Sequence, residues 1–236
     1  YMQEGLSIKT GADTLFSEFL QTGLLYVQTA SSMIPAKVLG PDAGDHVLDM
    51  CAAPGSKTTH IAALMGNRGS IDAWDVYPHK IKLIKNNAKR LGISIIHTEV
   101  RDSVKPLPFL YETYDKVLLD APCSGLGVLG HKVELRWRRK ESDLSVFPPL
   151  QKQLIEQAAK YTKTGGVLVY STCTLNPDEN EHIINEFLSL HSEFAPEEFN
   201  FPVLGKSLNG MMTFYPDLVR SDGFFVAKLR KVSHEA

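Results

Sequence analysis

The chain of 236 residues has few of the features that mark secreted or membrane-embedded proteins. It contains only three cysteines, an odd number that cannot form a complete disulfide framework. No apolar run approaches the about 18 residues that a membrane-spanning helix needs, and the first residues carry no signal-peptide pattern. We therefore expect a cytoplasmic protein rather than a secreted, disulfide-stapled or membrane-embedded one.

The sequence also lacks a strong net charge. Lysine and arginine number 25 against 27 acidic residues, a net charge of -2, so any binding of nucleic acid must depend on a local basic patch. Hydrophobic residues at 43% and charged residues at 22% are typical of a folded globular protein. Because repeats and obvious linkers are absent, we expect one domain over residues 28–236, preceded by a loosely structured lead-in over residues 1–27.

Short apolar runs alternate with helical patterns along most of the chain. Strands are predicted over residues 46–50, 70–74, 94–98, 116–119, 166–170 and 223–229. Helices are predicted over residues 28–39, 58–65, 78–91, 151–161 and 176–190. Pro35 fits the first helix only within its first turn, and Asn176 is the expected cap of the last one. This order predicts an α/β fold whose parallel sheet is covered on both faces and binds ligands at the carboxyl ends of its strands.

Three segments that follow predicted strands carry residues suited to a nucleoside. The small residues at 51–57 let the backbone approach a ligand, although an ordinary tight turn explains them equally well, and their spacing is not that of a phosphate-binding loop. Asp75 lies twenty residues after Gly55, the distance at which an acid accepts ribose hydroxyls, or it caps the next helix. Asp102 either faces an adenine edge or is a solvated loop residue. Together the three favour a nucleoside-bearing cofactor.

Two cysteines follow the fourth and fifth strands. Cys123 and Cys173 are fifty residues apart in sequence, and neighbouring parallel strands would bring them close together. Neither has a second cysteine or a histidine at a spacing suited to a metal, so we expect no metal site. A buried cysteine is often only a small hydrophobic residue, but these two lie where this architecture places reacting groups.

The sequence around these residues resembles the RNA cytosine-5 methyltransferase family. The resemblance covers roughly residues 24–230 and is carried by five blocks in the family's order, which are residues 28–32 (QTASS), 51–57 (CAAPGSK), 120–125 (DAPCSG), 170–174 (YSTCT) and 222–225 (DGFF). Within the family the chain is most similar to the bacterial enzymes that act on 16S ribosomal RNA. Ser56 departs from the second glycine of many relatives, a tolerable change.

The resemblance implies methyl transfer from S-adenosylmethionine to carbon 5 of a cytosine in RNA. Carbon 5 is a poor nucleophile, so a thiolate must first add to carbon 6. Cys173 matches the nucleophile of the family, and Cys123 matches the second cysteine, which is associated with product release. Asp120 would contact the cytosine or stabilise the activated ring. Lys57 would stabilise thiolate or carboxylate charge, unless it is a surface lysine at a helix start.

The resemblance also implies a Rossmann-like methyltransferase fold, a mostly parallel seven-stranded sheet with an antiparallel final strand. The expected S-adenosylmethionine-binding residues are Cys51, Ala52, Ala53, Pro54, Gly55, Ser56, Lys57, Asp75, Asp102 and Asp120. DNA cytosine methyltransferases use the thiol of the Pro-Cys block as nucleophile and would not need Cys173, and the Asn/Asp-Pro-Pro-aromatic block of amino-group methyltransferases is absent. Both comparisons favour RNA as the substrate.

A basic run at residues 131–140 follows the Cys123 block. It carries five lysines and arginines against one acid. From its position we expect it to contact RNA rather than to form a solvated face, through Lys132, Arg136, Trp137, Arg138 and Arg139.

Relatives often carry an additional N-terminal RNA-binding domain, and the start at Tyr1 fits its absence. Transfer RNA as substrate and a non-catalytic ribosome-assembly factor remain alternatives, and we expect a monomer.

Overall fold

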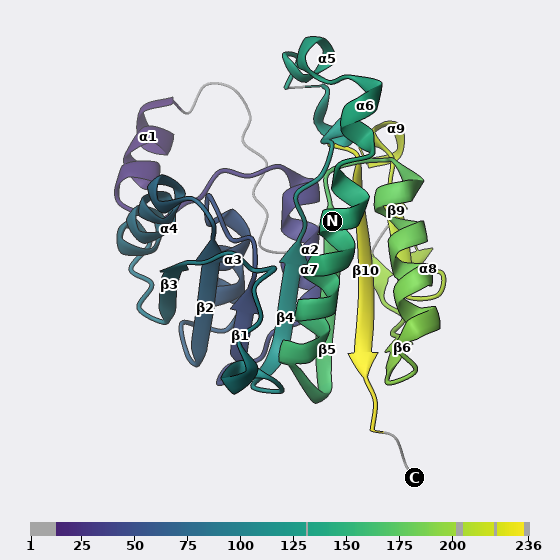
Figure 1. Cartoon of the computed structure of the whole chain (residues 1–236). Coiled ribbons are helices and arrows are strands. Elements are labelled where there is room, and N and C mark those ends of the chain that lie inside the picture. Colours follow the sequence, from purple (N-terminus) through teal and green to yellow (C-terminus); the bar gives the residue numbers. More distant parts are fainter. Residues whose placement is uncertain (1–12, 131, 202–204, 220, 234–236) are drawn as a thin grey trace.

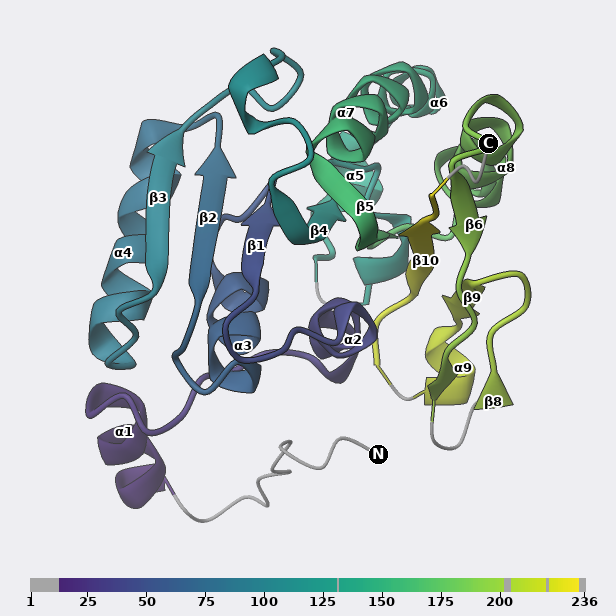
Figure 2. The same ribbon diagram turned by 90° about the horizontal axis from the view of Figure 1, so that it is seen from below.

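The centre of the fold is a large sheet with helices on both faces (Figures 1 and 2). The computed structural model describes residues 13–130, 132–201, 205–219 and 221–233. From one edge to the other, the strands of the sheet are β3 (Ile96–Val100), β2 (Ser70–Asp75), β1 (His46–Asp49), β4 (Tyr114–Asp120), β5 (Thr162–Thr172), β10 (Phe224–Lys231) and β6 (Phe194–Pro196). In addition, β9 (Met211–Phe214) pairs with β10, while β7 (Asn200–Phe201) and β8 (Gly205–Lys206) form a separate two-stranded sheet.

The strand directions agree with the sequence prediction. Strands β3, β2, β1, β4 and β5 are parallel to one another, and β10 lies antiparallel to β5. The sheet has eight strands rather than the expected seven, because the short strands β6 and β9 both pair with β10. These strands contain three and four residues, too few for an alternating pattern to mark them in the sequence.

The helices form two layers. On one face of the sheet lie α2 (Ala30–Leu39), α3 (Ser56–Leu64) and α4 (Pro78–Arg90), and on the other lie α7 (Phe147–Tyr161) and α8 (Glu181–Leu190) (Figure 2). The shorter helices are α1 (Asp13–Gln21), α5 (Leu135–Arg138), α6 (Glu141–Leu144) and α9 (Pro216–Val219). Helices α5 and α6 project beyond the carboxyl ends of β4 and β5 (Figure 1).

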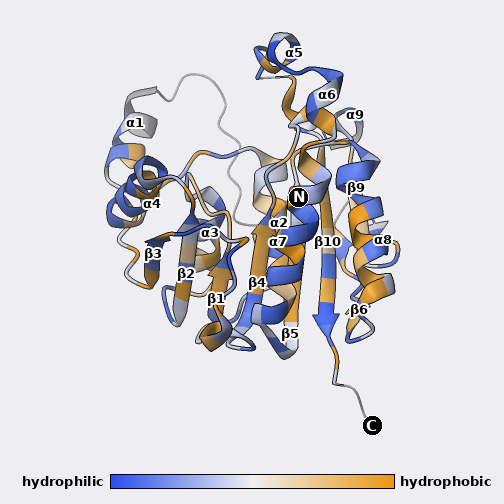
Figure 3. Ribbon diagram, viewed as in Figure 1, coloured by the Kyte–Doolittle hydropathy of each residue, from blue (hydrophilic) through white to orange (hydrophobic). Residues whose placement is uncertain are grey.

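Both faces of the central strands are apolar. In β1, Val47 packs against the layer of α2 and α3, while the next residue, Leu48, packs against the layer of α7. Both side chains are fully buried, as expected for a parallel sheet covered on both faces. Figure 3 shows this as hydrophobic strands enclosed by helices with hydrophilic outer surfaces. The polar residues that follow the strands therefore stand on a rigid, densely packed base.

The lead-in is more ordered than the sequence predicted. Residues 1–12 lie outside the described part of the chain, but Asp13–Gln21 form α1. The Arg90 guanidinium at the end of α4 donates hydrogen bonds to the carbonyls of Leu20 and Leu25, at 2.7 and 3.0 Å. The prediction of a loose segment was wrong for residues 13–21, where apolar residues at 15, 16, 19 and 20 follow a helical spacing that the sequence analysis did not recognise.

Two further helix predictions need correction. Pro35 is the sixth residue of α2 and lies in its interior rather than in its first turn. Ile34 and Val38, on either side of the proline in the sequence, are buried. Their packing offsets the helical hydrogen bond that proline cannot donate. The helix expected from Asn176 begins only at Glu181. The Asn176 side chain instead caps a short 3-10 turn by accepting the N–H of Asp178.

None of the helices in the described ranges is both long and apolar enough to cross a membrane.

Gly127 joins the segment after β4 to the sheet, and we predict that it tolerates no side chain. Its N–H donates to the Cys173 carbonyl at 3.0 Å and its carbonyl accepts from Gly223 at 2.8 Å. A Cβ on Gly127 would lie 2.1 Å from the Gly223 oxygen. We expect Gly127→Ala to lower the free energy of unfolding by about 1–3 kcal/mol through overpacking. Urea unfolding followed by circular dichroism measures this loss.

The matched control is Gly130→Ala, three residues away. No atom lies within 4 Å of a Cβ at this position. We expect its unfolding free energy to stay within about 0.5 kcal/mol of the parent. Equal stabilities of the two variants would contradict the assignment of a packing role to Gly127.

Candidate active site

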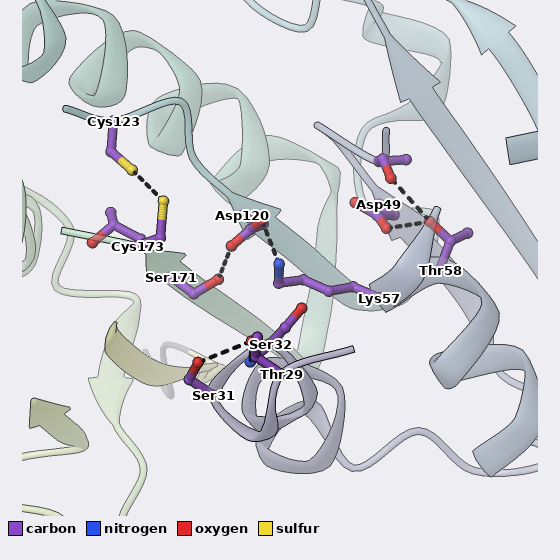
Figure 4. A network of polar contacts seen from close by, with 12 residues as sticks. Thr29, Ser31, Ser32, Asp49, Lys57, Thr58, Asp120, Cys123, Ser171 and Cys173 are labelled. Atoms are coloured by element: carbon purple, nitrogen blue, oxygen red, sulfur yellow. Dashed lines mark hydrogen bonds and ion pairs between the residues drawn. The ribbon is translucent and has the colours of Figure 1, made fainter. Parts of the chain in front are cut away.

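Two cysteines meet at the carboxyl ends of β4 and β5. The strands are paired so that Asp120 lies opposite Ser171, and each is followed within three residues by a cysteine. The sulfur atoms of Cys123 and Cys173 are 3.3 Å apart and point toward each other (Figure 4). Their predicted proximity is confirmed.

The environment makes the two thiols unequal. A hydrogen bond from the Cys123 thiol lowers the pKa of Cys173, and the ammonium groups of Lys57 and Lys132 act in the same direction. Burial and the Asp120 carboxylate oppose this shift, but the pKa of Cys173 still lies below its ordinary value. The same hydrogen bond and burial raise the pKa of Cys123 well above its usual range. Cys173 is therefore the more readily ionised thiol of the pair, and Cys123 is the one that stays protonated more readily.

A partly buried ion pair lies beside the sulfurs. Lys57, near the start of α3, places its Nζ 2.7 Å from Asp120 Oδ2, and the Ser171 hydroxyl donates to Asp120 Oδ1 at 2.8 Å (Figure 4). Burial alone would lower the pKa of Lys57, but Asp120 and then Cys173 raise it above its ordinary value. Lys57 is not the surface lysine that the sequence left open. It is a permanent positive charge between a carboxylate and the reactive thiol.

A cavity of about 520 Å³ opens next to this cluster. From the predicted cofactor loop, its wall contains Cys51, Ala52, Ala53, Pro54, Ser56 and Lys57. Asp120, Cys173 and Lys132 also line it, so it joins the thiolate to the loop that follows β1. Gly55 is absent from the lining. It has a φ of 102°, which other residues rarely adopt, and a Cβ there would lie 3.2 Å from Ile84 Cα in α4, a tight contact.

Asp49 is a residue that the sequence analysis missed. It is the last residue of β1, it is buried and it lines the cavity. Burial raises its pKa to about 7, with a further contribution from Asp120, although the Thr58 hydroxyl donates to it at 2.7 Å. An acid in an otherwise apolar strand, directly before a loop of small residues, was the signal that could have identified it.

Asp75 and Asp102 lie at the same edge of the sheet but outside the cavity lining. Asp75 Oδ1 accepts the N–H of Tyr77 at 2.9 Å, in the turn before α4, and no side chain caps that helix, so the capping alternative is not what the structure shows. Asp102 Oδ1 accepts the N–H of Val104 at 3.3 Å. Contacts of these carboxylates with a ribose and an adenine remain predictions.

The basic run divides into two parts. Lys132, Arg136, Trp137 and Arg138 are exposed, and Trp137 has 86% of its surface accessible. Arg139 does not belong to this exposed surface. Its guanidinium donates to the Ser124 carbonyl at 2.8 Å and lies over the Phe147 ring. His131, which begins the run, lies outside the described residues.

Other candidate sites are less suited to chemistry. A larger hollow of about 660 Å³ lies between residues 23–28, α3 and the turn after α4, and none of the three cysteines lines it. Within the ranges that the structure describes, no group of three histidine, cysteine or acidic side chains could hold a metal ion. The cavity beside Cys173 is therefore the candidate active site.

Comparisons of the sequence and the fold with known proteins find similar proteins. The family described as 16S rRNA methyltransferase RsmB/F matches residues 36–230. The chain is similar to "Probable ribosomal RNA small subunit methyltransferase B" of Bacillus subtilis, with 40% identity over 91% of this chain and 49% of that protein. It is also similar to ribosomal RNA small subunit methyltransferase F of Erwinia tasmaniensis, with 40% identity over 99% of this chain and 51% of that protein.

Among solved structures, NSun6 of Pyrococcus horikoshii, crystallised with SFG, is similar with a TM-score of 0.81 and 38% identity, over 96% of this chain and 57% of that one. The chain spans about half the length of the curated relatives that it matches. The fold is that of S-adenosylmethionine-dependent methyltransferases, as predicted. On the extent of these matches, the chain belongs to the 16S rRNA methyltransferase RsmB/F family.

Proposed function

We propose that this protein transfers a methyl group from S-adenosylmethionine to carbon 5 of a cytosine in small-subunit ribosomal RNA, through a covalent adduct with Cys173. The observation that carries the proposal is the contact between the Cys123 and Cys173 sulfurs, 3.3 Å apart, with Cys173 on the wall of the cavity. The names of the relatives support ribosomal RNA as the substrate.

The cavity has the donor and acceptor chemistry to hold S-adenosylmethionine, which supplies the electrophilic methyl group when bound. Two buried oxygens on its wall, Asp49 Oδ1 and Gln28 Oε1, have no hydrogen-bond partner in the described part of the chain. They match the ammonium, hydroxyl and amino donors of that molecule. We propose that residues 51–57 and Asp49 hold the cofactor, with Asp75 and Asp102 toward its ribose and adenine. The SFG in the related archaeal structure is an analogue of the same molecule.

The polar cluster suits nucleophilic addition to a pyrimidine. Cys173 would add to carbon 6 of the cytosine, because this thiol is ionised at a lower pH than an ordinary cysteine. The ring, activated at carbon 5, would accept the methyl group and leave S-adenosylhomocysteine. The carbon 5 proton would then pass to solvent as the bond between carbon 6 and the Cys173 sulfur breaks and releases the thiolate. Cys123 would assist this last stage, since it is a protonated thiol in contact with the departing sulfur. Asp120, held by Lys57 and Ser171, would contact the cytosine between the cofactor and Cys173.

An exposed surface is available for RNA beside the active site. The lobe of α5 and α6 presents Trp137, Arg136 and Arg138, and Lys132 connects it to the cavity wall. Aromatic stacking and contacts to phosphates are the main sources of affinity for unpaired RNA. The target cytosine must be unpaired or flipped out, because a stacked base hides both faces of its ring. The same chemistry would serve on transfer RNA, and competition between the two RNAs in a methyl-transfer assay decides between them.

The roles of the cysteines predict opposite effects of their removal. Cys173→Ala should abolish methylation, because the attacking sulfur is lost. Cys123→Ala should retain a covalent protein–RNA species, because expulsion of the thiolate slows. Denaturing gels with radiolabelled RNA measure both outcomes. The reactions are run at about pH 8.5, where an ordinary thiol is half ionised.

The double variant Cys123→Ala/Cys173→Ala is the control and should retain no complex. Full turnover by Cys173→Ala, or the absence of any retained species with Cys123→Ala, would reject the two-thiol assignment.

The raised pKa of Asp49 predicts that cofactor affinity depends on pH. Above about pH 7 Asp49 is a carboxylate and accepts hydrogen bonds from cationic donors, whereas below this value it is protonated. We therefore expect the affinity for S-adenosylmethionine to fall by up to about tenfold between pH 7 and pH 6 and to be level above pH 8. Titration calorimetry measures this profile. Asp49→Asn should bind weakly at every pH, and an unchanged slope in this variant would exclude Asp49 as its source.

Trp137 is predicted to bind RNA by stacking. Trp137→Ala should weaken binding of a short unpaired RNA by about 1–3 kcal/mol, measured by fluorescence anisotropy, without changing cofactor affinity. The matched control is Phe109→Ala. Phe109 is 75% exposed but lies in the turn that precedes β4, away from the carboxyl ends of the strands. A similar loss in both variants would contradict a specific role for Trp137.

A further inference from the structure

The loop that carries Cys123 has no regular secondary structure of its own. Residues 121–125 belong to neither a helix nor a strand. Side chains from other elements bond its backbone: Gln151 of α7 donates to the Pro122 carbonyl at 2.9 Å, and Glu179 accepts the N–H of Ser124 at 2.8 Å. Beyond Ala121, whose N–H still bonds Ser171 of β5, the position of the thiol depends on these side chains and on Arg139, which donates to the Ser124 carbonyl.

Glu179 is the centre of this support. It is completely buried, in the 3-10 turn before α8. Besides the N–H of Ser124, its carboxylate accepts hydrogen bonds from Gln151 Nε2 and Asn176 Nδ2, both at 3.1 Å. All three donors are neutral. A buried carboxylate is tolerated only when its oxygens are hydrogen-bonded, so displacing any of these donors is costly.

The same turn is also tied to the strand that delivers Cys173. The Tyr170 hydroxyl donates to the Glu179 carbonyl at 2.6 Å. The neighbouring Asn180 accepts from the Thr172 hydroxyl at 2.6 Å and donates to the Thr174 carbonyl at 3.0 Å. Residues 179–180 thus hold one cysteine loop through the Glu179 side chain and bracket the other cysteine on both sides.

We propose that Glu179 is a positioning residue that holds the Cys123 thiol against Cys173. Its effect on the thiol is indirect, because its carboxylate contacts the backbone of the Cys123 loop and is not part of the cavity wall. A hydrogen bond between sulfur atoms is lost when the loop moves by about 1 Å, since such bonds weaken steeply with distance. The importance of this position for catalysis depends on the proposed function, but the geometry itself can be tested without RNA.

Glu179→Gln tests the proposal with almost no change in volume. Ser124 and Gln151 both donate to Glu179 Oε2, and Asn176 donates to Oε1. An amide has only one acceptor oxygen, so its NH₂ group must face either Asn176 or both Ser124 and Gln151, all of which are donors there. We expect the Cys123 loop to shift and its hydrogen bond to Cys173 to weaken. The readout is the pH dependence of Cys173 alkylation by iodoacetamide, followed by peptide mass spectrometry so that each cysteine is measured separately.

In the parent protein the midpoint of Cys173 alkylation should lie below that of an ordinary thiol. In Glu179→Gln it should rise by about one pH unit, which makes alkylation about tenfold slower at neutral pH because only the thiolate reacts. Gln151→Leu removes one donor to Glu179 and the bond to Pro122, and it should shift the midpoint in the same direction. This second variant tests the proposal if Glu179→Gln does not fold.

Two controls separate positioning from a general loss of structure. Glu181→Gln changes a nearby carboxylate that contacts Thr213, and it should leave the midpoint unchanged. Cys123→Ala should raise the midpoint by itself, and adding Glu179→Gln should then have no further effect, because Glu179 acts through Cys123. Affinity for S-adenosylmethionine, measured on each variant, should stay at the parent value.

An unchanged alkylation midpoint in a folded Glu179→Gln or Gln151→Leu protein would overturn the proposal. So would additive shifts in the double variant, which would mean that Glu179 acts on Cys173 independently of Cys123. A protein that shows the predicted shifts but methylates no RNA would support the role of Glu179 while rejecting the proposed function. The two failures are therefore distinguishable.

Discussion

The arrangement of the site depends on two sulfur atoms 3.3 Å apart at the carboxyl ends of neighbouring strands. Adjacent parallel strands are only about 4.8 Å apart, so the residues that follow them converge without a long excursion of the chain. The hydrogen bond between them lowers the pKa of Cys173 and raises that of Cys123. Lys57 and Lys132 lower the pKa of Cys173 further, and burial raises that of Cys123 further. One geometric contact and an asymmetric field thus give two residues of the same type different acidities, as the proposed roles require.

The charges around the thiolate are balanced rather than uniformly positive. Lys57 lies between Asp120 and Cys173, and all of these groups are screened from water to a large extent. A lysine facing only the thiolate would stabilise it further, but a strongly stabilised thiolate is also a weaker nucleophile. Sharing the ammonium with Asp120 limits that stabilisation. A lowered pKa of Cys173 that Asp120 opposes is consistent with the proposed role, in which this group first attacks a ring and later leaves it.

The sequence predicted the elements that have local patterns and failed where the structure depends on tertiary contacts. The strands that carry Asp120 and Cys173 were identified by their apolar runs, and the loops after them by their small and reactive residues. Arg139 was assigned to the RNA surface because a run of basic residues does not reveal which side chain turns inward. Glu179 was interpreted as part of a helix start, since its position after Asn176 fits that pattern, and nothing local indicates that its carboxylate bonds Ser124.

Asp49 and Glu179 illustrate why polar residues in such a site are hard to anticipate. Each is a buried carboxyl group, which costs stability unless other groups solvate it. The fold can accommodate them because the apolar layers below the carboxyl edge hold the strands and α7 in place independently of the polar groups. The two acids differ in how their oxygens are hydrogen-bonded. Three donors bond the carboxylate of Glu179. In Asp49, which lines the cavity, the Thr58 hydroxyl bonds Oδ2, whereas Oδ1 has no side-chain partner among the described residues. A carboxylate whose oxygens are all hydrogen-bonded is suited to fixing the backbone, and one with a free oxygen is suited to receiving a ligand. The hydrogen-bond partners therefore distinguish the two roles, which sequence and burial alone do not.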